Sequence, residues 1–159
     1  VSGDGSTNAT VNGTGNIIIG YDEDSDSDDK SGSHNLVVGY GHTYSSYGGI
    51  VIGNNNRITG EYSSVSGGCY NNAAGDYSSI SGGWGNYASG ECSSISGGRI
   101  NYALGNWSSI SGGMNNTASG WYTSVSGGLS NIASGNESSV SGDAGKTFLD
   151  NSADGNTID

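Results

Sequence analysis

The sequence contains no proline, and only four of its 159 residues are Lys or Arg, against fifteen Asp or Glu. The formal net charge of −11 argues against nucleic acid or an anionic membrane surface as a partner, because both carry negative charge. No apolar run approaches the roughly 20 residues that cross a bilayer, so we expect no direct membrane insertion. The two cysteines, Cys69 and Cys92, are too few for a disulfide framework.

Histidine is equally scarce, and this bears on catalysis. His34 and His42 are the only two, and neither is accompanied in the sequence by a Ser or Cys nucleophile motif or by a metal-ligand partner. We therefore expect a protein that is not an enzyme.

Hydrophobic residues make up only 31% of the chain, a low value that is typical of disordered proteins. Ten Tyr, three Trp and the absence of Pro are not typical of disorder, and they indicate an ordered chain. An acidic surface rich in Ser and Asn suits an extracellular or cell-surface protein, which is the location we expect.

The sequence does contain a repeat of 15 residues. Its unit reads S-S-[VI]-S-G-G-x-x-N-x-A-x-G-x-x, as in residues 78–92. One column of the repeat is β-branched: Val65, Ile80, Ile95, Ile110, Val125 and Val140. A second column is asparagine: Asn71, Asn86, Asn101, Asn116 and Asn131. Columns of Gly and Ala keep the same spacing, so the repeat is highly specific.

Within each unit the pattern has a period of two residues. Ser63 and Val65 fall on one face of an extended segment and Ser64 falls on the other. The density of Gly and Ser excludes helix, while Gly67, Gly68 and Gly75 are predicted to supply positive φ angles at turns. The sequence therefore predicts an all-β fold, a parallel β-solenoid (β-roll) whose 15-residue coils, here called rungs, hold two short strands each and stack about 4.8 Å apart.

The repeat divides the chain into three parts. Residues 1–60 hold more apolar rungs and a cap, interrupted by an acidic insertion at 21–32. Residues 61–142 form the regular array, and residues 143–159 form a C-terminal cap or tail. Each rung of the array offers one Val or Ile and one Ala to the core, which is little apolar surface to offset the entropy of ordering. We therefore expect the chain to associate with further copies of itself.

The unit S-[VI]-S-G-G-x-x-N-x-A-x-G resembles the head repeat of YadA-like trimeric autotransporter adhesins, S-V-A-I-G-x-x-S-x-A-x-G. The similarity covers roughly residues 16–142 and rests on Gly68, Ala73, Gly75 and their equivalents. It implies a left-handed parallel β-roll, association of three chains, and a head that binds host or matrix surfaces. The period of 15 departs from the family's 14, and Gly67 stands where the family has an apolar residue. The unit is also similar to Ser/Gly-rich repeats of bacterial and viral surface fibres.

Two acidic segments are candidate Ca²⁺ sites, and no other cofactor is indicated. The insertion has the D-x-D-x-D spacing that supplies hard oxygen ligands, with candidates Asp22, Asp24, Asp26 and Asp28. Residues 150–155 resemble the first half of a D-x-S-x-D-G calcium loop, with candidates Asp150, Ser152 and Asp154. In both places the alternative is a solvated acidic segment.

A column of aromatic residues, interrupted by Cys92 and ended by Glu137, is a candidate binding surface. Its members and the nearby tryptophans are Tyr62, Tyr77, Trp107, Tyr122, Trp84 and Trp121. Aromatic side chains on so lean a core either pack against a neighbouring chain or stack on sugar rings. The sequence leaves both open.

Two further features concern the outer surface. Serine columns such as those of Ser64 and Ser66 are predicted to face outward as a hydroxyl lattice, which either binds ice or polysaccharide or stays solvated. Acceptor motifs for N-glycosylation occur at Asn8, Asn12, Asn106, Asn115 and Asn136.

These features predict a non-enzymatic extracellular structural or adhesive module, part of a surface fibre or adhesin head and associated as a homotrimer. It would present repeated Ser, Asn and aromatic columns on a rigid solenoid and so bind a glycan or matrix ligand multivalently. The alternatives are a filament subunit joined head-to-tail and a glycan- or ice-binding solenoid.

Overall fold

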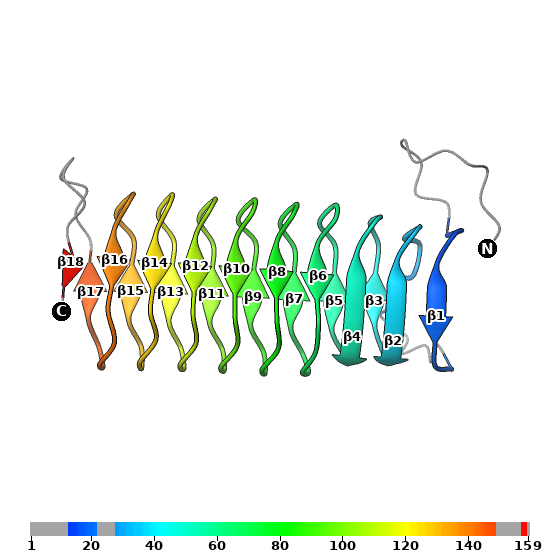
Figure 1. Ribbon diagram of the computed structural model, residues 1–159, viewed down its shortest axis with the longest axis horizontal. Coiled ribbons are helices and arrows are strands. Elements are labelled where there is room, and N and C mark those ends of the chain that lie inside the picture. Colours follow the sequence, from blue (N-terminus) through cyan, green and yellow to red (C-terminus); the bar gives the residue numbers. More distant parts are fainter. Residues whose placement is uncertain (1–12, 22–27, 149–156, 159) are drawn as a thin grey trace.

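Short parallel strands wind into a coil along the whole of the described chain. The computed structural model describes residues 13–21, 28–148 and 157–158, and within them every regular element is a β-strand. The strands stack as a β-solenoid of about eight turns (Figure 1). The predicted fold class, an all-β parallel solenoid with a β-roll type of repeat, is confirmed.

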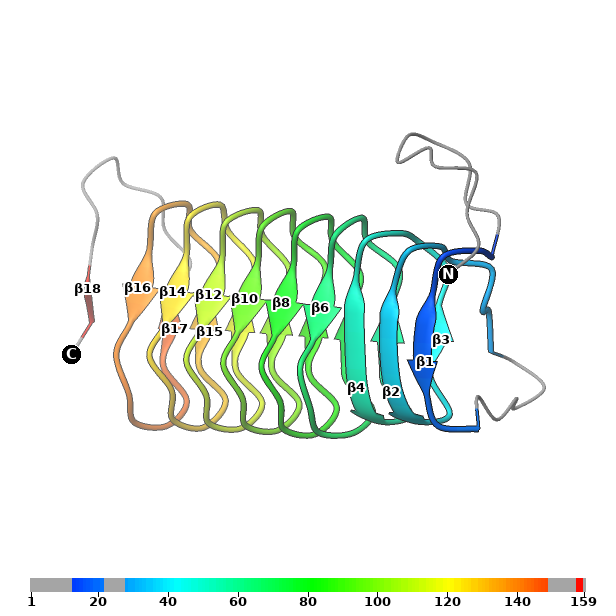
Figure 2. The same cartoon turned by 45° about the vertical axis from the view of Figure 1, so that its right-hand side comes forward.

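Two parallel sheets face each other and are joined by turns at both edges, as the oblique view in Figure 2 shows. The first sheet has ten strands: β1 (Ile17–Ile19), β2 (Leu36–Tyr40), β4 (Ile50–Asn54), β6 (Ser64–Val65), β8 (Ser79–Ile80), β10 (Ser94–Ile95), β12 (Ser109–Ile110), β14 (Ser124–Val125), β16 (Ser139–Val140) and β18 (Thr157–Ile158). The second has eight: β3 (Thr43–Tyr44), β5 (Arg57–Ile58), β7 (Asn72–Ala73), β9 (Tyr87–Ala88), β11 (Tyr102–Ala103), β13 (Thr117–Ala118), β15 (Ile132–Ala133) and β17 (Thr147–Phe148).

From β2 to β16 the number of residues per rung changes once. In the array each residue pairs with its equivalent 15 positions away, as Ser79 does with Ser94. Between β2 and β4 the offset is 14, with Leu36 opposite Ile50. The change occurs at Gly67, because β4 and β6 still pair with an offset of 14 whereas Asn54 pairs with Cys69. The array rung is thus a 14-residue rung with one residue added after its first strand.

The core lies between the sheets and consists of two columns of apolar side chains, one from each sheet. In the array the first sheet supplies the Val and Ile column that begins at Val65, and the second supplies the Ala column that begins at Ala73. In the N-terminal rungs Tyr44 and Ile58 take the places of Ala, so the core is thicker there. All of these side chains are fully buried.

A ladder of buried asparagines closes one turn of every rung. Asn101 shows the pattern: its Nδ2 donates to the carbonyls of Gly97 and Gly113, each at 3.1 Å. Its Oδ1 accepts the backbone N–H of Asn116, at 3.0 Å. The same contact continues from Asn56 to Lys146, whose backbone N–H is bound by Asn131. The amide side chain therefore supplies both the acceptor and the donors that the turn would otherwise leave unpaired in a buried place.

The two glycine columns serve different purposes. Gly68 has a φ of +76°, and its equivalents also lie in the left-handed region, as the repeat predicts. Gly67 and Gly75 do not have positive φ, so the reason predicted for them is wrong. At Gly75 a Cβ would collide with the backbone carbonyl of Gly90 in the next rung. Gly75 is needed because two rungs approach each other closely.

Candidate functional site

The turns that lead from the second sheet back to the first carry exposed side chains on a left-handed backbone. At the second position of these turns φ lies between +54° and +59°, in Tyr62, Tyr77, Cys92, Trp107, Tyr122 and Glu137. A bulky residue in this conformation costs free energy that Gly or Asn would not cost. The backbone therefore does not account for the choice of aromatic residues.

The turn at the other edge provides an internal comparison. Its left-handed positions are Asn55, Tyr70, Gly85, Ile100, Asn115, Ser130 and Gly145. Within residues 61–142 Gly and Asn occur once each there, as the conformation favours, whereas the first column has neither in that range and has its glycine, Gly48, one rung before Tyr62. The aromatic column is thus maintained against the local backbone preference, which indicates a role outside the fold of the single chain.

The rings of this column stack on one another. Tyr62 and Tyr77 are stacked with centroids 5.5 Å apart, and Trp107 and Tyr122 with centroids 4.8 Å apart. Tyr47 meets the edge of Tyr62 at 5.2 Å, and Trp121 meets Trp107 at 6.4 Å. We call this surface the aromatic edge: Tyr47, Tyr62, Tyr77, Trp107, Trp121 and Tyr122. Cys92 breaks it into two separate stacks.

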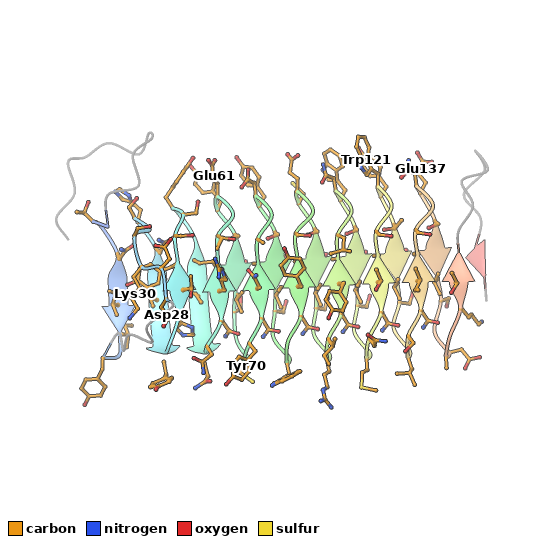
Figure 3. All side chains as sticks on the ribbon, turned by 180° about the vertical axis from the view of Figure 1, so that it is seen from behind. Asp28, Lys30, Glu61, Tyr70, Trp121 and Glu137 are labelled. Atoms are coloured by element: carbon orange, nitrogen blue, oxygen red, sulfur yellow. The ribbon has the colours of Figure 1, made fainter. Side chains whose placement is uncertain are left out.

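Carboxylates accompany the rings. Glu61, Asp76, Glu91 and Glu137 lie along this edge, and Figure 3 shows Glu61, Trp121 and Glu137 on the same side of the solenoid. The Tyr47 hydroxyl donates to Glu61 Oε2 at 2.7 Å, and this hydrogen bond raises the pKa of Tyr47 to about 12. The aromatic edge is therefore acidic as well as apolar.

The opposite edge has a different composition. Its bridging column is Cys69, Trp84, Arg99, Met114 and Leu129, and with Tyr70 it forms what we call the mixed edge. The Tyr70 ring meets Trp84 at 6.0 Å, and the Arg99 guanidinium lies over Trp84, 5.0 Å from the ring centre. Trp84, Met114 and Leu129 are each 41% to 42% exposed. Figure 3 shows Tyr70 on the side away from Glu61.

The structure therefore separates residues that the sequence grouped together. Trp121 lies at the aromatic edge in the column of Glu61, next to the column of Tyr62, whereas Trp84 lies at the mixed edge. Trp84 follows Tyr77 by seven residues, about half of the 15-residue period. Because each rung has two strands and two turns, half a period carries the chain from the turn at one edge to the turn at the other. Tyr47, Met114 and Leu129 were not among the predicted surface residues. The 15-residue step could not reveal Tyr47, because the offset is 14 in these rungs and places Tyr47 in the column of Glu61.

The outer face of the first sheet carries two columns of serine. Ser64 and its equivalents are half-buried, while Ser66 and its equivalents are exposed. At Gly97 and Gly112 a Cβ would meet nothing within 4 Å, so the fold has room for a side chain at these positions. The structure thus carries a regular array of hydroxyl groups on this face.

Most of the predicted calcium ligands lie outside the described residues, namely Asp22, Asp24, Asp26, Asp150, Ser152 and Asp154. Asp28 is half-buried, and its Oδ1 accepts the Thr43 hydroxyl at 3.2 Å. It borders a polar pocket of about 400 Å³ that Arg57 and Tyr70 also line. Where side chains are described, His, Cys, Asp and Glu form no group of three or more that could hold a metal ion.

The glycosylation motifs lie in different surroundings, and Asn8 and Asn12 are outside the described residues. The Oδ1 atoms of Asn106 and Asn136 accept backbone N–H groups of the preceding rung, at 3.1 and 2.9 Å. Asn115 is exposed, and its Nδ2 donates to the Ser130 hydroxyl. Asn106 and Asn136 thus stabilise turns at the aromatic edge.

Comparison with known proteins does not assign the chain to a family. No protein-family model matches the chain, and no curated protein is similar to it in sequence. Over the residues that the structure describes, no helix is long and apolar enough to cross a membrane.

Proposed function

We propose that this chain is a non-enzymatic extracellular module with a structural and adhesive role, part of a surface fibre or an adhesin head. The observation that carries the proposal is the aromatic edge. Exposed rings are held there on a strained backbone and repeat at the rung spacing. Such a surface is suited to contact with a partner.

The mechanism is repetition on a rigid support. Ladder hydrogen bonds and the buried asparagines fix each rung relative to the next, so identical outward groups recur about every 4.8 Å. A ligand with its own repeat, such as a matrix fibre or a polysaccharide, meets several weak sites at once. Each further contact then forms at high effective concentration, and the total affinity rises without any single strong site.

A YadA-like head is the form of this module that we favour, as a homotrimer at the cell surface. The 14-residue offset between β2 and β4 supports it, because 14 is the period of the family's repeat. The array has a small hydrophobic core, which supports association. Ala is the only apolar side chain that most rungs bury in this core from the second sheet. We retain Ca²⁺ binding by the two acidic segments as part of the proposal.

Adhesion assays test the function. We expect the folded chain to be retained on surfaces coated with extracellular matrix or polysaccharide. The double variant Trp107→Ala, Tyr122→Ala is expected to lose most of this retention, because it removes one complete stack. Thr117→Ala, on the outer face of the second sheet, is the control and should bind normally. Unchanged retention of the double variant would argue against an adhesive aromatic edge.

A head-to-tail filament subunit is the second candidate, and the N-terminal end of the solenoid favours it. Ile17, Ile18 and Ile19 of β1 are 53%, 40% and 59% exposed. Within the described residues β1 has a sheet partner on one side only, so its other side offers unpaired backbone groups. Electron microscopy of the wild type and of Ile18→Lys separates the two cases. Filaments that disappear in the variant would favour the second candidate.

A further inference from the structure

The aromatic edge is broken at one rung, and the break has a defined size. Tyr77 and Trp107 are two rungs apart, so the gap over Cys92 measures about 9.6 Å. Tyr62 stacks on Tyr77 and Tyr122 stacks on Trp107. The remaining sides of Tyr77 and Trp107 therefore have only the small Cys92 side chain between them in the column. Glu91, the residue before Cys92, places an exposed carboxylate at this gap.

The same rung carries the array's only basic residue, on the mixed edge. Residues 61–142 contain Arg99 and no other Lys or Arg. Its guanidinium lies over Trp84. Position 92 falls between 84 and 99 in the coil, so the Trp84–Arg99 pair brackets the height of Cys92 along the solenoid axis. One edge thus has a gap beside an acid, and at the same height the other has a planar cation beside a ring.

We propose that two copies of this chain lie side by side, pointing in the same direction, with the mixed edge of one against the aromatic edge of the next. Arg99 of one copy enters the gap between Tyr77 and Trp107 of its neighbour and meets Glu91 there. This inference rests on the proposed structural role and names the partner of the aromatic edge, which is a second copy of the chain.

The dimensions of the gap suit a guanidinium group. At the centre of a gap of about 9.6 Å the cation would lie about 4.8 Å from each ring, within the roughly 6 Å over which cation–π attraction acts. Within one chain, Arg99 already lies 5.0 Å from the Trp84 ring. A planar guanidinium also stacks on rings and pairs with a carboxylate through its edge, whereas an ammonium group has no flat face.

The neighbouring rungs are complementary in the same alignment. Met114 falls in height between Trp107 and Tyr122, so an exposed apolar side chain faces the second stack. Leu129 follows it one rung later, beside the end of that stack. If one copy slips toward its C-terminal end by a rung, Arg99 faces Asn106, which has no charge. If it slips the other way by a rung, Arg99 takes the height of Trp84, on the other side of Cys92 and between Asp76 and Glu91, so charge permits this register as well.

Charge explains why the partner is a copy. The chain carries −11, so most parallel approaches of two copies are repulsive. The alignments that bring Arg99 within about half a rung of Glu91 relieve this repulsion in the array, because no other basic residue is available there. A heterologous contact of this kind uses two different surfaces and so can continue from copy to copy.

Charge exchange tests the contact, with sedimentation velocity at physiological salt as the readout. We expect Arg99→Glu and Glu91→Arg each to weaken side-by-side association by roughly tenfold or more. The double variant carrying both changes should restore it. Arg57→Glu, with the same charge change on β5, should associate as the wild type does. The contact is overturned if the wild type shows no side-by-side association, if Arg57→Glu weakens it equally, or if the double variant fails to recover.

The size of the gap is tested independently at Cys92. Cys92→Trp fills the gap with a residue type that already occupies this conformation in Trp107, and we expect it to fold and to block association. Cys92→Ala leaves the gap open and should associate normally. A disulfide between Cys69 of one copy and Cys92 of another would contradict the alignment, because the two positions differ by about one and a half rungs, roughly 7 Å.

These outcomes are separable from those of the proposed function. A fixed trimer whose mass and further association are unchanged in Arg99→Glu and Glu91→Arg would overturn the side-by-side contact and leave the adhesive module standing. Charge-dependent association without retention on coated surfaces would do the reverse.

Discussion

At the scale of single residues, stability depends on buried amides as much as on apolar side chains. Each ladder asparagine is fully buried and bonds to backbone groups of its own rung and of the next. Because such groups are costly to leave unpaired, the ladder makes each rung depend on the identity of one residue in the rung before it.

Asn101→Ala tests this dependence. The change removes two donated hydrogen bonds and leaves the buried N–H of Asn116 without its acceptor. We expect the free energy of unfolding to fall by about 3 kcal/mol, measured by urea denaturation. Asn115→Ala, at the neighbouring exposed position with left-handed backbone, should lower it by only about 1 kcal/mol. Equal effects of the two substitutions would mean that the ladder bonds add little.

Tyr47 gives a prediction that depends on pH. Its hydrogen bond to Glu61 raises its pKa to about 12, above the ordinary value of 10. The bond therefore contributes stability in full below pH 10, and the contribution is lost as the pH rises through about 12. NMR titration of labelled tyrosines should show a late transition for the ring carbons of Tyr47. Glu61→Gln should move that transition back toward 10, and no movement would exclude Glu61 as its cause.

At the scale of strands and turns, the sequence predicted what repeats with a period and missed what depends on three-dimensional approach. The alternation around Val65 predicted the buried face of each first strand, and the 15-residue step predicted parallel pairing in register. The steric role of Gly75 could not be read from the same pattern, because glycine occurs there for closeness and at Gly68 for positive φ. The sequence pattern also did not show that Trp84 and Tyr77 lie at opposite edges, because this depends on how half a rung crosses from one edge of the solenoid to the other.

Two glycines of one rung distinguish these causes. Gly105→Ala would place a Cβ against the carbonyl of Gly120, and we expect a loss of about 3 kcal/mol of unfolding free energy or failure to fold. At Gly97 a Cβ meets nothing within 4 Å, so Gly97→Ala should change stability by less than about 0.5 kcal/mol. Thermal melts of both variants are the measurement, and similar melting temperatures would contradict the close approach.

At the scale of the whole molecule, the solenoid is a stack in which each rung contacts its neighbours. Removing one complete rung should therefore preserve the fold. We expect deletion of residues 106–120 to give a cooperative protein whose urea m-value is lower by about one eighth, in proportion to the surface lost from about eight turns. Loss of all structure in the deletion variant would mean that the array is not modular.

The same modularity explains why this chain is suited to assembly. A rung with so little core gains from any surface that covers its edges, and both edges of the array expose large apolar side chains. Self-association therefore connects the lean core, the aromatic edge and the proposed adhesive role.

The mass of the protein in solution tests that connection most directly. Sedimentation equilibrium of the wild type over a wide range of concentration should give a discrete trimer that gains further, side-by-side association as the concentration rises. A mass equal to that of one chain at every concentration up to about 1 mM would contradict this account. A Kd above that limit corresponds to a binding free energy weaker than about 4 kcal/mol.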